Sequence, residues 1–187
     1  VVNPGGIWRG TRANPNGVDL MRNAPVDARE RVPFLIGGQR LSAALPWYRG
    51  RLGAPMELEN QAVCRVVDEE LLSRRFSIAV DCHSGFGVSD RIWFPYAHTA
   101  RPIEHLPEVH ALKTIFDQSH LHHRYVVEPQ SRQYLAHGDL WDHLYEVDYQ
   151  RLAPADFIRN VLTYCALARR DYTPDQLAAE GTLVREQ

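Results

Sequence analysis

The sequence predicts an α/β layered domain, in which helices cover a buried sheet. Two observations carry this prediction. In several stretches apolar residues recur every three to four positions, as on the buried face of a helix, whereas other apolar runs are short and rich in β-branched residues, as in a buried strand. These two kinds of stretch alternate along the chain. The length of 187 residues, with 44% hydrophobic and 24% charged residues, fits a single domain spanning residues 1–187.

The elements follow one another in a clear order. Residues 3–17 are rich in Gly, Pro and Asn and are expected to form a functional loop, after which residues 24–55 continue as irregular structure. Helices are predicted over residues 55–75, 103–118, 138–149 and 154–170. Strands are predicted over residues 76–83 and over residues 125–127, which precede Pro129.

Composition limits the range of partners. A formal net charge of −2 gives no electrostatic reason to expect a nucleic acid or an anionic membrane as partner. Three widely spaced cysteines, Cys64, Cys82 and Cys165, are expected to be reduced thiols of a cytoplasmic protein. No apolar run approaches the ~18–20 residues of a membrane span. The chain begins at Val1-Val2 without a signal-peptide pattern, and it is expected to start in the middle of a domain.

Four side chains are candidates for chemistry. His83 ends a predicted buried strand, and ligands bind at the carboxyl ends of strands in α/β sheets. Arg12 and Arg22 flank a turn and can bind a carboxylate or an oxyanion. Tyr134 can donate a hydrogen bond to a substrate. Taken singly, each has a plain alternative: a histidine bonded within the core, solvated arginines, or a tyrosine packed at the base of a loop.

The motifs around these residues resemble those of zinc metallocarboxypeptidases of the carboxypeptidase A/B type. That family reads NPDG, an Arg, GVDLNRN, a strand ending in HS, and Tyr-x3-Gly-x3-Asp-Trp. In the same order, and at similar separations, this chain carries Asn3-Pro4-Gly5-Gly6, Arg12, Gly17-Val18-Asp19-Leu20-Met21-Arg22-Asn23, His83-Ser84, and Tyr134-x3-Gly138-x3-Asp142. The resemblance covers residues 3–142 and implies a carboxypeptidase-like mixed central sheet flanked by helices, with the N-terminal part absent.

The resemblance also implies roles. His83 would be a ligand of Zn²⁺, which would activate water as a Lewis acid. Arg12 would stabilise the oxyanion of the scissile carbonyl, and Tyr134 would lie on a mobile loop that closes over the substrate. Arg22 would bind the substrate's C-terminal carboxylate. Asn23 and Ser84, which belong to the matched motifs, are the remaining substrate-binding candidates.

Three departures from the family pattern stand out. The HxxE segment that supplies the family's first two zinc ligands precedes NPDG, where this chain begins, although three protein ligands are expected at a catalytic zinc. Met21 replaces an asparagine of the carboxylate-binding motif. The general-base glutamate, expected about a dozen residues after Asp142, is missing; Glu146 and Asp156 are the nearest acidic residues, and neither is assigned that role.

Two histidine clusters could supply metal ligands instead. One is an HxxE formed by His143 and Glu146, whose side chains would share one helical face, and the other comprises His120, His122 and His123. The preferred interpretation is that His143 and Glu146 lie on the surface of a helix and that the other three histidines lie in a solvated turn.

The expected function is therefore zinc-dependent removal of a C-terminal residue from a peptide. The expected ligand is a peptide or acyl amino acid with a free carboxylate, because deacylases of N-acyl amino acids share the fold. The alternative is a non-catalytic peptide-binding domain. Trp141, near the expected floor of the side-chain pocket, disfavours a basic C-terminal residue in the substrate.

Overall fold

The computed structural model describes residues 1–187 except 73, 75–76, 84–88, 152–161 and 168–187, and it describes residues 83, 147–151 and 162–167 by their backbone alone.

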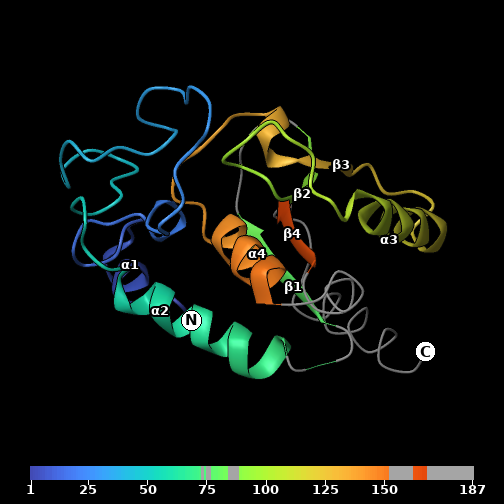
Figure 1. Cartoon of the computed structure of the whole chain (residues 1–187), viewed down its shortest axis with the longest axis horizontal. Helices are drawn as coiled ribbons and strands as arrows, with labels where there is room; N and C mark the ends of the chain where they lie inside the picture. Colours follow the sequence, from blue (N-terminus) through green and yellow to red (C-terminus); the bar gives the residue numbers. More distant parts are fainter. Residues whose placement is uncertain (73, 75–76, 84–88, 152–161, 168–187) are drawn as a thin grey trace.

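A mixed four-stranded sheet forms the centre of the molecule, in the order β1-β4-β2-β3 (Figure 1). Its strands are β1 (Ile78–His83), β2 (Arg91–Phe94), β3 (Val126–Pro129) and β4 (Leu162–Leu167). Strand β1 runs parallel to β4, with Ile78 opposite Leu162, and β2 runs parallel to β3. The two halves join through antiparallel pairing of β2 with β4. The combination of a mixed sheet with helices agrees with the predicted α/β class.

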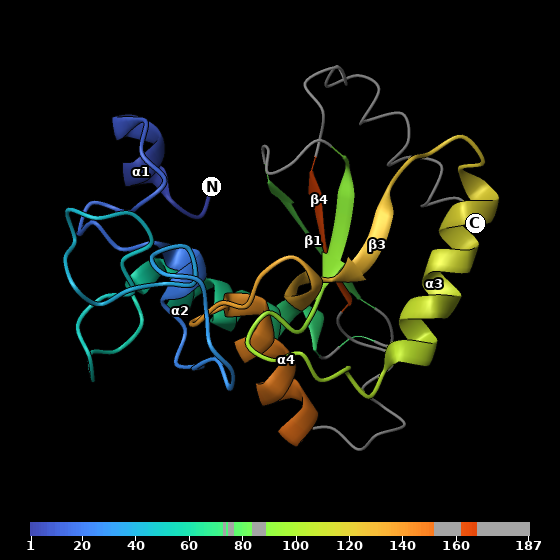
Figure 2. The same cartoon turned by 90° about the horizontal axis from the view of Figure 1, so that it is seen from above.

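Helices lie on both sides of this sheet. They are α1 (Pro4–Arg9), α2 (Leu58–Val66), which continues as the π-helix η2 (Val67–Leu71), α3 (Leu106–Ser119) and α4 (Leu140–Arg151). Two short 3-10 helices are η1 (Leu20–Arg22) and η3 (Gln130–Arg132). Helix α3 lies beyond β3, whereas residues 1–55 lie on the opposite side of the molecule, past α2 and α4 (Figures 1 and 2).

Helix α4 contributes to both apolar clusters of the core. Leu140 and Leu144 pack with Ala24 and Val67, which joins α4 to α2 and to the N-terminal segment. Tyr145, on the other side of α4, packs with residues of β2 and α3. Helix α4 therefore packs against both the sheet and residues 1–55.

Most predicted elements are confirmed, with shifted ends. The strand at 76–83 is β1, the strand before Pro129 is β3, and the helices at 55–75, 103–118 and 138–149 are α2 with η2, α3 and α4. Residues 3–17 were expected to be a loop but contain α1, because Asn3 caps it and Pro4 suits the first helical turn.

The predicted helix over residues 154–170 is wrong where the structure describes it, because residues 162–167 form β4. Nearly every residue of this stretch is apolar or β-branched, a composition that periodicity cannot assign to a helix or a strand. Pairing with β1 on one side and β2 on the other decides in favour of the strand. Strand β2 itself was not predicted. Among the described residues, no helix is both long and apolar enough to cross a membrane.

Candidate carboxylate-binding site

The loop after α1 carries Arg12 and is tied to the helix by Asn3. The Asn3 side chain accepts a hydrogen bond from Gly6 N at 2.8 Å and donates one to the Arg12 carbonyl at 3.2 Å. Gly6 leaves no room for a side chain, because an added Cβ would lie 2.2 Å from Asn3 Nδ2. The Asn-Pro-Gly-Gly sequence thus fixes the backbone from which Arg12 extends.

Asp19 orients the Arg12 guanidinium. Arg12 Nε donates to Asp19 Oδ2 at 2.7 Å, and the other oxygen of this buried carboxylate accepts from Met21 N at 3.0 Å, at the start of η1. Partial burial lowers the pKa of Arg12, but the charge and hydrogen bond of Asp19, with smaller contributions from Tyr134 and Asp81, raise it overall. Arg12 is therefore held as a cation close to Tyr134 and Asp81.

Arg22 is a buried cation whose hydrogen-bond partners among the described residues include no carboxylate. It is 2% exposed, and its guanidinium donates to the carbonyls of Ile36 (3.3 Å) and Met21 (2.9 Å) and to the Tyr134 hydroxyl (3.1 Å). The guanidinium carbon lies 5.7 Å from the centre of the Tyr134 ring. Within the described residues, Arg22 forms no ion pair.

Gly138 brings the Tyr134 loop against Arg22. Its backbone has a φ of +69°, and a Cβ added there would lie 1.9 Å from the Arg22 carbonyl oxygen. Hydrogen bonds from Gly138 N to Val26 O (2.6 Å) and from Ala24 N to Gly138 O (3.0 Å) fasten the two segments together. The spacing from Tyr134 to Gly138 therefore positions the phenol beside the guanidinium, although the two residues are 112 positions apart.

The remaining predicted site residues are Asn23, His83 and Ser84, and none has a described side-chain hydrogen bond with Arg12, Arg22 or Tyr134. Asn23 was expected to contact substrate, but its side chain donates to Arg49 O at 3.0 Å and accepts from Glu57 N at 2.7 Å. This buried amide therefore connects two loops and has both its polar atoms engaged. His83 is the last residue of β1, and its side chain lies outside the described part, as does all of Ser84.

Asp81 connects β1 to this cluster. It accepts a hydrogen bond from Trp141 Nε1 at 3.0 Å and is one of the charges that act on Arg12. Because Asp81 lies two residues before His83 on the same strand, the end of β1 lies near Arg12. Trp141, expected near the pocket floor, lines a small cavity together with Trp93 and Asp139.

The described residues do not assemble a zinc site. No group of three or more His, Cys, Asp or Glu residues in the described part of the chain could hold a metal ion. Glu146 lies 3.9 Å from His98 Nε2. His143 is half-buried, and this burial lowers the pKa of His143. His123 lies 2.8 Å from Asp117. Asp156 is outside the described residues.

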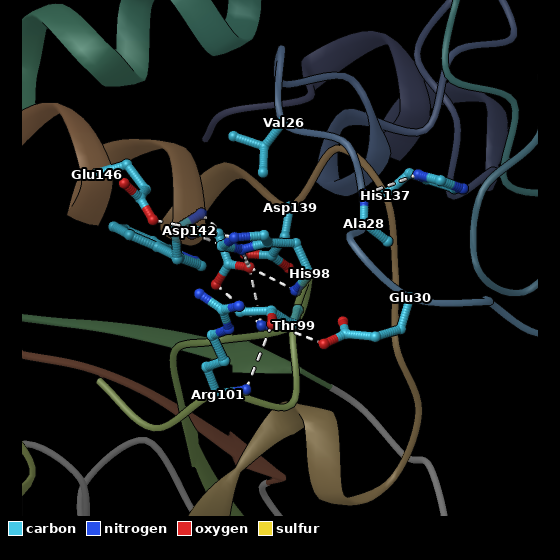
Figure 3. Close-up of polar contacts among 12 residues, drawn as sticks. Val26, Ala28, Glu30, His98, Thr99, Arg101, His137, Asp139, Asp142 and Glu146 are labelled. Atoms are coloured by element: carbon cyan, nitrogen blue, oxygen red, sulfur yellow. Dashed lines mark hydrogen bonds and ion pairs between the residues drawn. The ribbon is translucent and has the colours of Figure 1, made fainter. Parts of the chain in front are cut away.

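Sequence reasoning missed a buried polar cluster at the start of α4. Both oxygens of Asp142 accept hydrogen bonds from Ala97 N (3.0 and 2.8 Å), and Oδ2 accepts a further one from His98 N (2.7 Å). The His98 ring also lies 2.7 Å from Oδ2 (Figure 3). Asp139 lies beside Asp142 and caps α4, with Oδ1 accepting from the backbone N–H groups of Trp141 and Asp142 at 3.0 and 3.1 Å. A signal for Asp139 was present, since it directly follows Gly138 in the matched motif.

Comparison with known proteins gives a distant structural likeness. No family model and no curated protein matches the sequence. Among solved structures, the chain is similar to the crystal structure of thrombin activatable fibrinolysis inhibitor (TAFI), with a TM-score of 0.53 and 20% sequence identity. The match covers 79% of this chain and 33% of the TAFI chain, so this chain corresponds to about a third of that protein. At this identity the likeness supports a carboxypeptidase-like fold and nothing finer.

Proposed function

We propose that this chain is part of a carboxypeptidase-like hydrolase that recognises the free C-terminal carboxylate of a peptide, with Arg22 as the carboxylate-binding group. Removal of the C-terminal residue by hydrolysis is the activity that is consistent both with recognition of a C-terminal carboxylate and with the carboxypeptidase-like fold. An acyl amino acid presents the same carboxylate and would use the same site.

The observation that carries the proposal is that Arg22 is a buried cation that forms no close ion pair among the described residues, although the carboxylate of Asp139 is near enough to interact with its charge. A buried cation without a counter-ion is costly, typically by several kcal/mol. In the described residues its guanidinium donates to two backbone carbonyls and to the hydroxyl of Tyr134, and to no carboxylate. A ligand carboxylate would supply the missing negative charge through forked hydrogen bonds.

Tyr134 and Arg12 complete the proposed site. The Tyr134 hydroxyl accepts a hydrogen bond from one terminal nitrogen of Arg22. A carboxylate oxygen of the ligand can replace the hydroxyl there when the Tyr134 loop moves away, or can share this nitrogen with it when the loop closes. Arg12 is fixed at Nε by Asp19, whereas no described residue accepts a hydrogen bond from its two terminal nitrogens. These free donors suit the polarisation of a substrate carbonyl and the stabilisation of its oxyanion.

Zn²⁺ is the cofactor implied by the family resemblance, with His83 as one proposed ligand. The described residues alone do not fit a catalytic zinc, since they contain no group of three ligands. The roles proposed for the arginines and for Tyr134 therefore stand independently of the metal.

A second candidate function is a non-catalytic domain that binds peptide C-termini. The missing three-ligand group among the described residues favours it. Both candidates require the carboxylate site, and they differ in whether the bound peptide is cleaved.

The test compares a peptide with its C-terminal amide by calorimetry, using the wild type, Arg22→Met and the control Arg65→Met, which removes an exposed arginine of α2. We expect the wild type and Arg65→Met to prefer the free carboxylate by about 30-fold, equivalent to about 2 kcal/mol, and Arg22→Met to lose this preference. Circular dichroism establishes that the variants are folded. Equal wild-type affinity for the two peptides refutes the carboxylate site.

A second measurement separates the two candidates. The same peptide is incubated with the protein before and after addition of Zn²⁺, and release of the C-terminal amino acid is followed by chromatography. Release that requires Zn²⁺ and is lost in Arg12→Gln supports the hydrolase. Carboxylate-dependent binding without release supports the binding domain.

A further inference from the structure

Arg49 is a second buried guanidinium that packs against Arg22. It is 5% exposed, and its Nε donates a hydrogen bond to the Arg22 carbonyl at 3.2 Å. The two side chains also flank Gly38, since a Cβ added there would lie 3.0 Å from Arg49 Cδ and 3.3 Å from Arg22 Cδ. Arg49 lies outside the motifs that resemble the carboxypeptidase family, and the carboxylate site proposed above does not use it.

Hydrogen bonds hold Arg49 in this position. Its Nη2 donates to the Val26 carbonyl at 3.2 Å and pairs with Asp27 Oδ1 at 2.7 Å. Its backbone carbonyl accepts a hydrogen bond from Asn23 Nδ2 at 3.0 Å. Arg49 is therefore bonded at several points to residues 22–27, the segment that begins with Arg22.

The two guanidiniums place two positive charges in the interior of the protein. Burial and the nearby charges of Arg40 and Arg22 lower the pKa of Arg49, and the hydrogen bond and charge of Asp27 offset only part of this effect. An arginine nevertheless stays protonated at neutral pH. Because buried charges are weakly screened, an anion that binds at one of these cations is also attracted by the other.

Asp27 neutralises Arg49 incompletely. Among the described residues, the ion pairs of Arg49 involve Asp27 alone, and the Asp27 side chain is 75% exposed, so solvent weakens the pairing. His137 Nδ1 lies 3.6 Å from the same Asp27 oxygen and accepts a hydrogen bond from Ala28 N at 2.9 Å (Figure 3). Burial, followed by the charge of Arg49, lowers the pKa of His137, so this ring adds no positive charge at pH 7.

We propose that Arg49 is a positioning residue whose positive charge strengthens the binding of the ligand's carboxylate at Arg22, and that Asp27 limits this effect by pairing with Arg49. The proposal rests on the carboxylate-binding function proposed above. The carboxylate need not contact Arg49, because the charge acts through the interior that both guanidiniums occupy. An uncharged C-terminal amide does not gain from this charge, so the contribution of Arg49 appears in the preference for carboxylate over amide.

The test measures the affinities of acetyl-Gly-Leu with a free carboxylate and of its C-terminal amide, by calorimetry at pH 7. We expect Arg49→Gln to reduce the wild-type preference for the carboxylate by about 5-fold, because it removes the charge. Arg49→Lys keeps the charge and should retain most of the preference. Circular dichroism establishes that the variants are folded.

Asp27→Asn is the decisive variant, because an exposed side chain can be replaced without disturbing the core. The asparagine oxygen can still accept from Arg49, but the negative charge is gone, so the preference for the carboxylate should rise by about 2-fold. A purely structural role of Arg49 predicts no such gain. The matched control is Glu70→Gln, which removes the exposed carboxylate of the ion pair with Arg74, and it should leave the preference unchanged.

The other outcomes are distinct. Equal losses in Arg49→Gln and Arg49→Lys, or an unchanged or lower preference in Asp27→Asn, overturn the proposal and leave the carboxylate site standing. If the Arg49 variants do not fold, Asp27→Asn alone decides. If the wild type binds the carboxylate and the amide equally, the proposed function fails, and this proposal fails with it.

Discussion

Replacement of Gly138 by alanine tests whether the contact between the Tyr134 loop and Arg22 is as close as the structure has it. An alanine Cβ at this position would lie 1.9 Å from the Arg22 carbonyl oxygen and 2.4 Å from its carbon. Neither backbone can easily move, because Gly138 N bonds Val26 O and Gly138 O accepts from Ala24 N. The variant must therefore absorb a steric clash in addition to backbone strain.

Matched controls separate these two costs. Gly10 and Gly53 have φ values of +63° and +76°, close to the +69° of Gly138, but an added Cβ at either would meet nothing within 4 Å. Gly10→Ala and Gly53→Ala should each cost about 1–2 kcal/mol in the free energy of unfolding, from the left-handed backbone alone. Gly138→Ala should cost about 1–3 kcal/mol more, as overpacking of a buried site does.

Urea unfolding monitored by circular dichroism measures these costs. With a denaturant slope of about 1–3 kcal/mol per molar urea, an additional 2 kcal/mol or so moves the midpoint of Gly138→Ala roughly 1 M below those of the controls. The variant should also lose discrimination between peptide carboxylate and amide, because the clash pushes the Tyr134 loop away from Arg22. A Gly138→Ala midpoint equal to that of Gly53→Ala would refute the close packing of these two segments.

Two further predictions concern the carboxylates at the start of α4. Asp142→Asn removes the charge that faces His98 and two backbone N–H groups, so it should lower the free energy of unfolding, measured by urea titration, by about 3–5 kcal/mol. Glu146→Gln, at a carboxylate 3.9 Å from the same ring, should have a far smaller effect. Equal losses of stability in the two variants would contradict the assigned network. Because burial and Asp142 raise the pKa of Asp139 from 3.8 to about 7, the folded state holds a proton that the unfolded state releases, and stability should fall as the pH rises between about 4 and 7. Asp139→Asn should lack this fall, and parallel pH profiles of the two proteins would show that Asp139 is not the titrating group.

The local sequence was sufficient for much of the fold. Strand β1 was predicted from a run of β-branched residues, and helices α3 and α4 from apolar residues spaced three to four positions apart. These patterns are visible in the sequence because the buried face of a helix or strand places apolar residues at regular intervals. The ordered motifs also predicted that Arg12, Arg22 and Tyr134 belong to one site. The structure places the Tyr134 hydroxyl against Arg22, and Tyr134 is also close enough to Arg12 to contribute to the raised pKa of Arg12.

Tertiary contacts decided the rest. The apolar stretch at residues 162–167 gives the same hydrophobic signal as a helix or as a strand, and only its pairing with β1 and β2 makes it β4. Asn23 stands beside Arg22 in the sequence, but its side chain bonds two distant backbone groups, and the motif did not predict these contacts.

The same holds for the polar groups of the cavity. Asp139 and Trp93 are 46 positions apart, and nothing local to either predicts that each leaves a buried polar atom unpaired among the described residues. A motif records which side chains a site contains, because their chemistry and spacing are local. Whether a buried charge or N–H finds a partner depends on what the folded chain packs against it, and for this protein only the tertiary structure supplies that information.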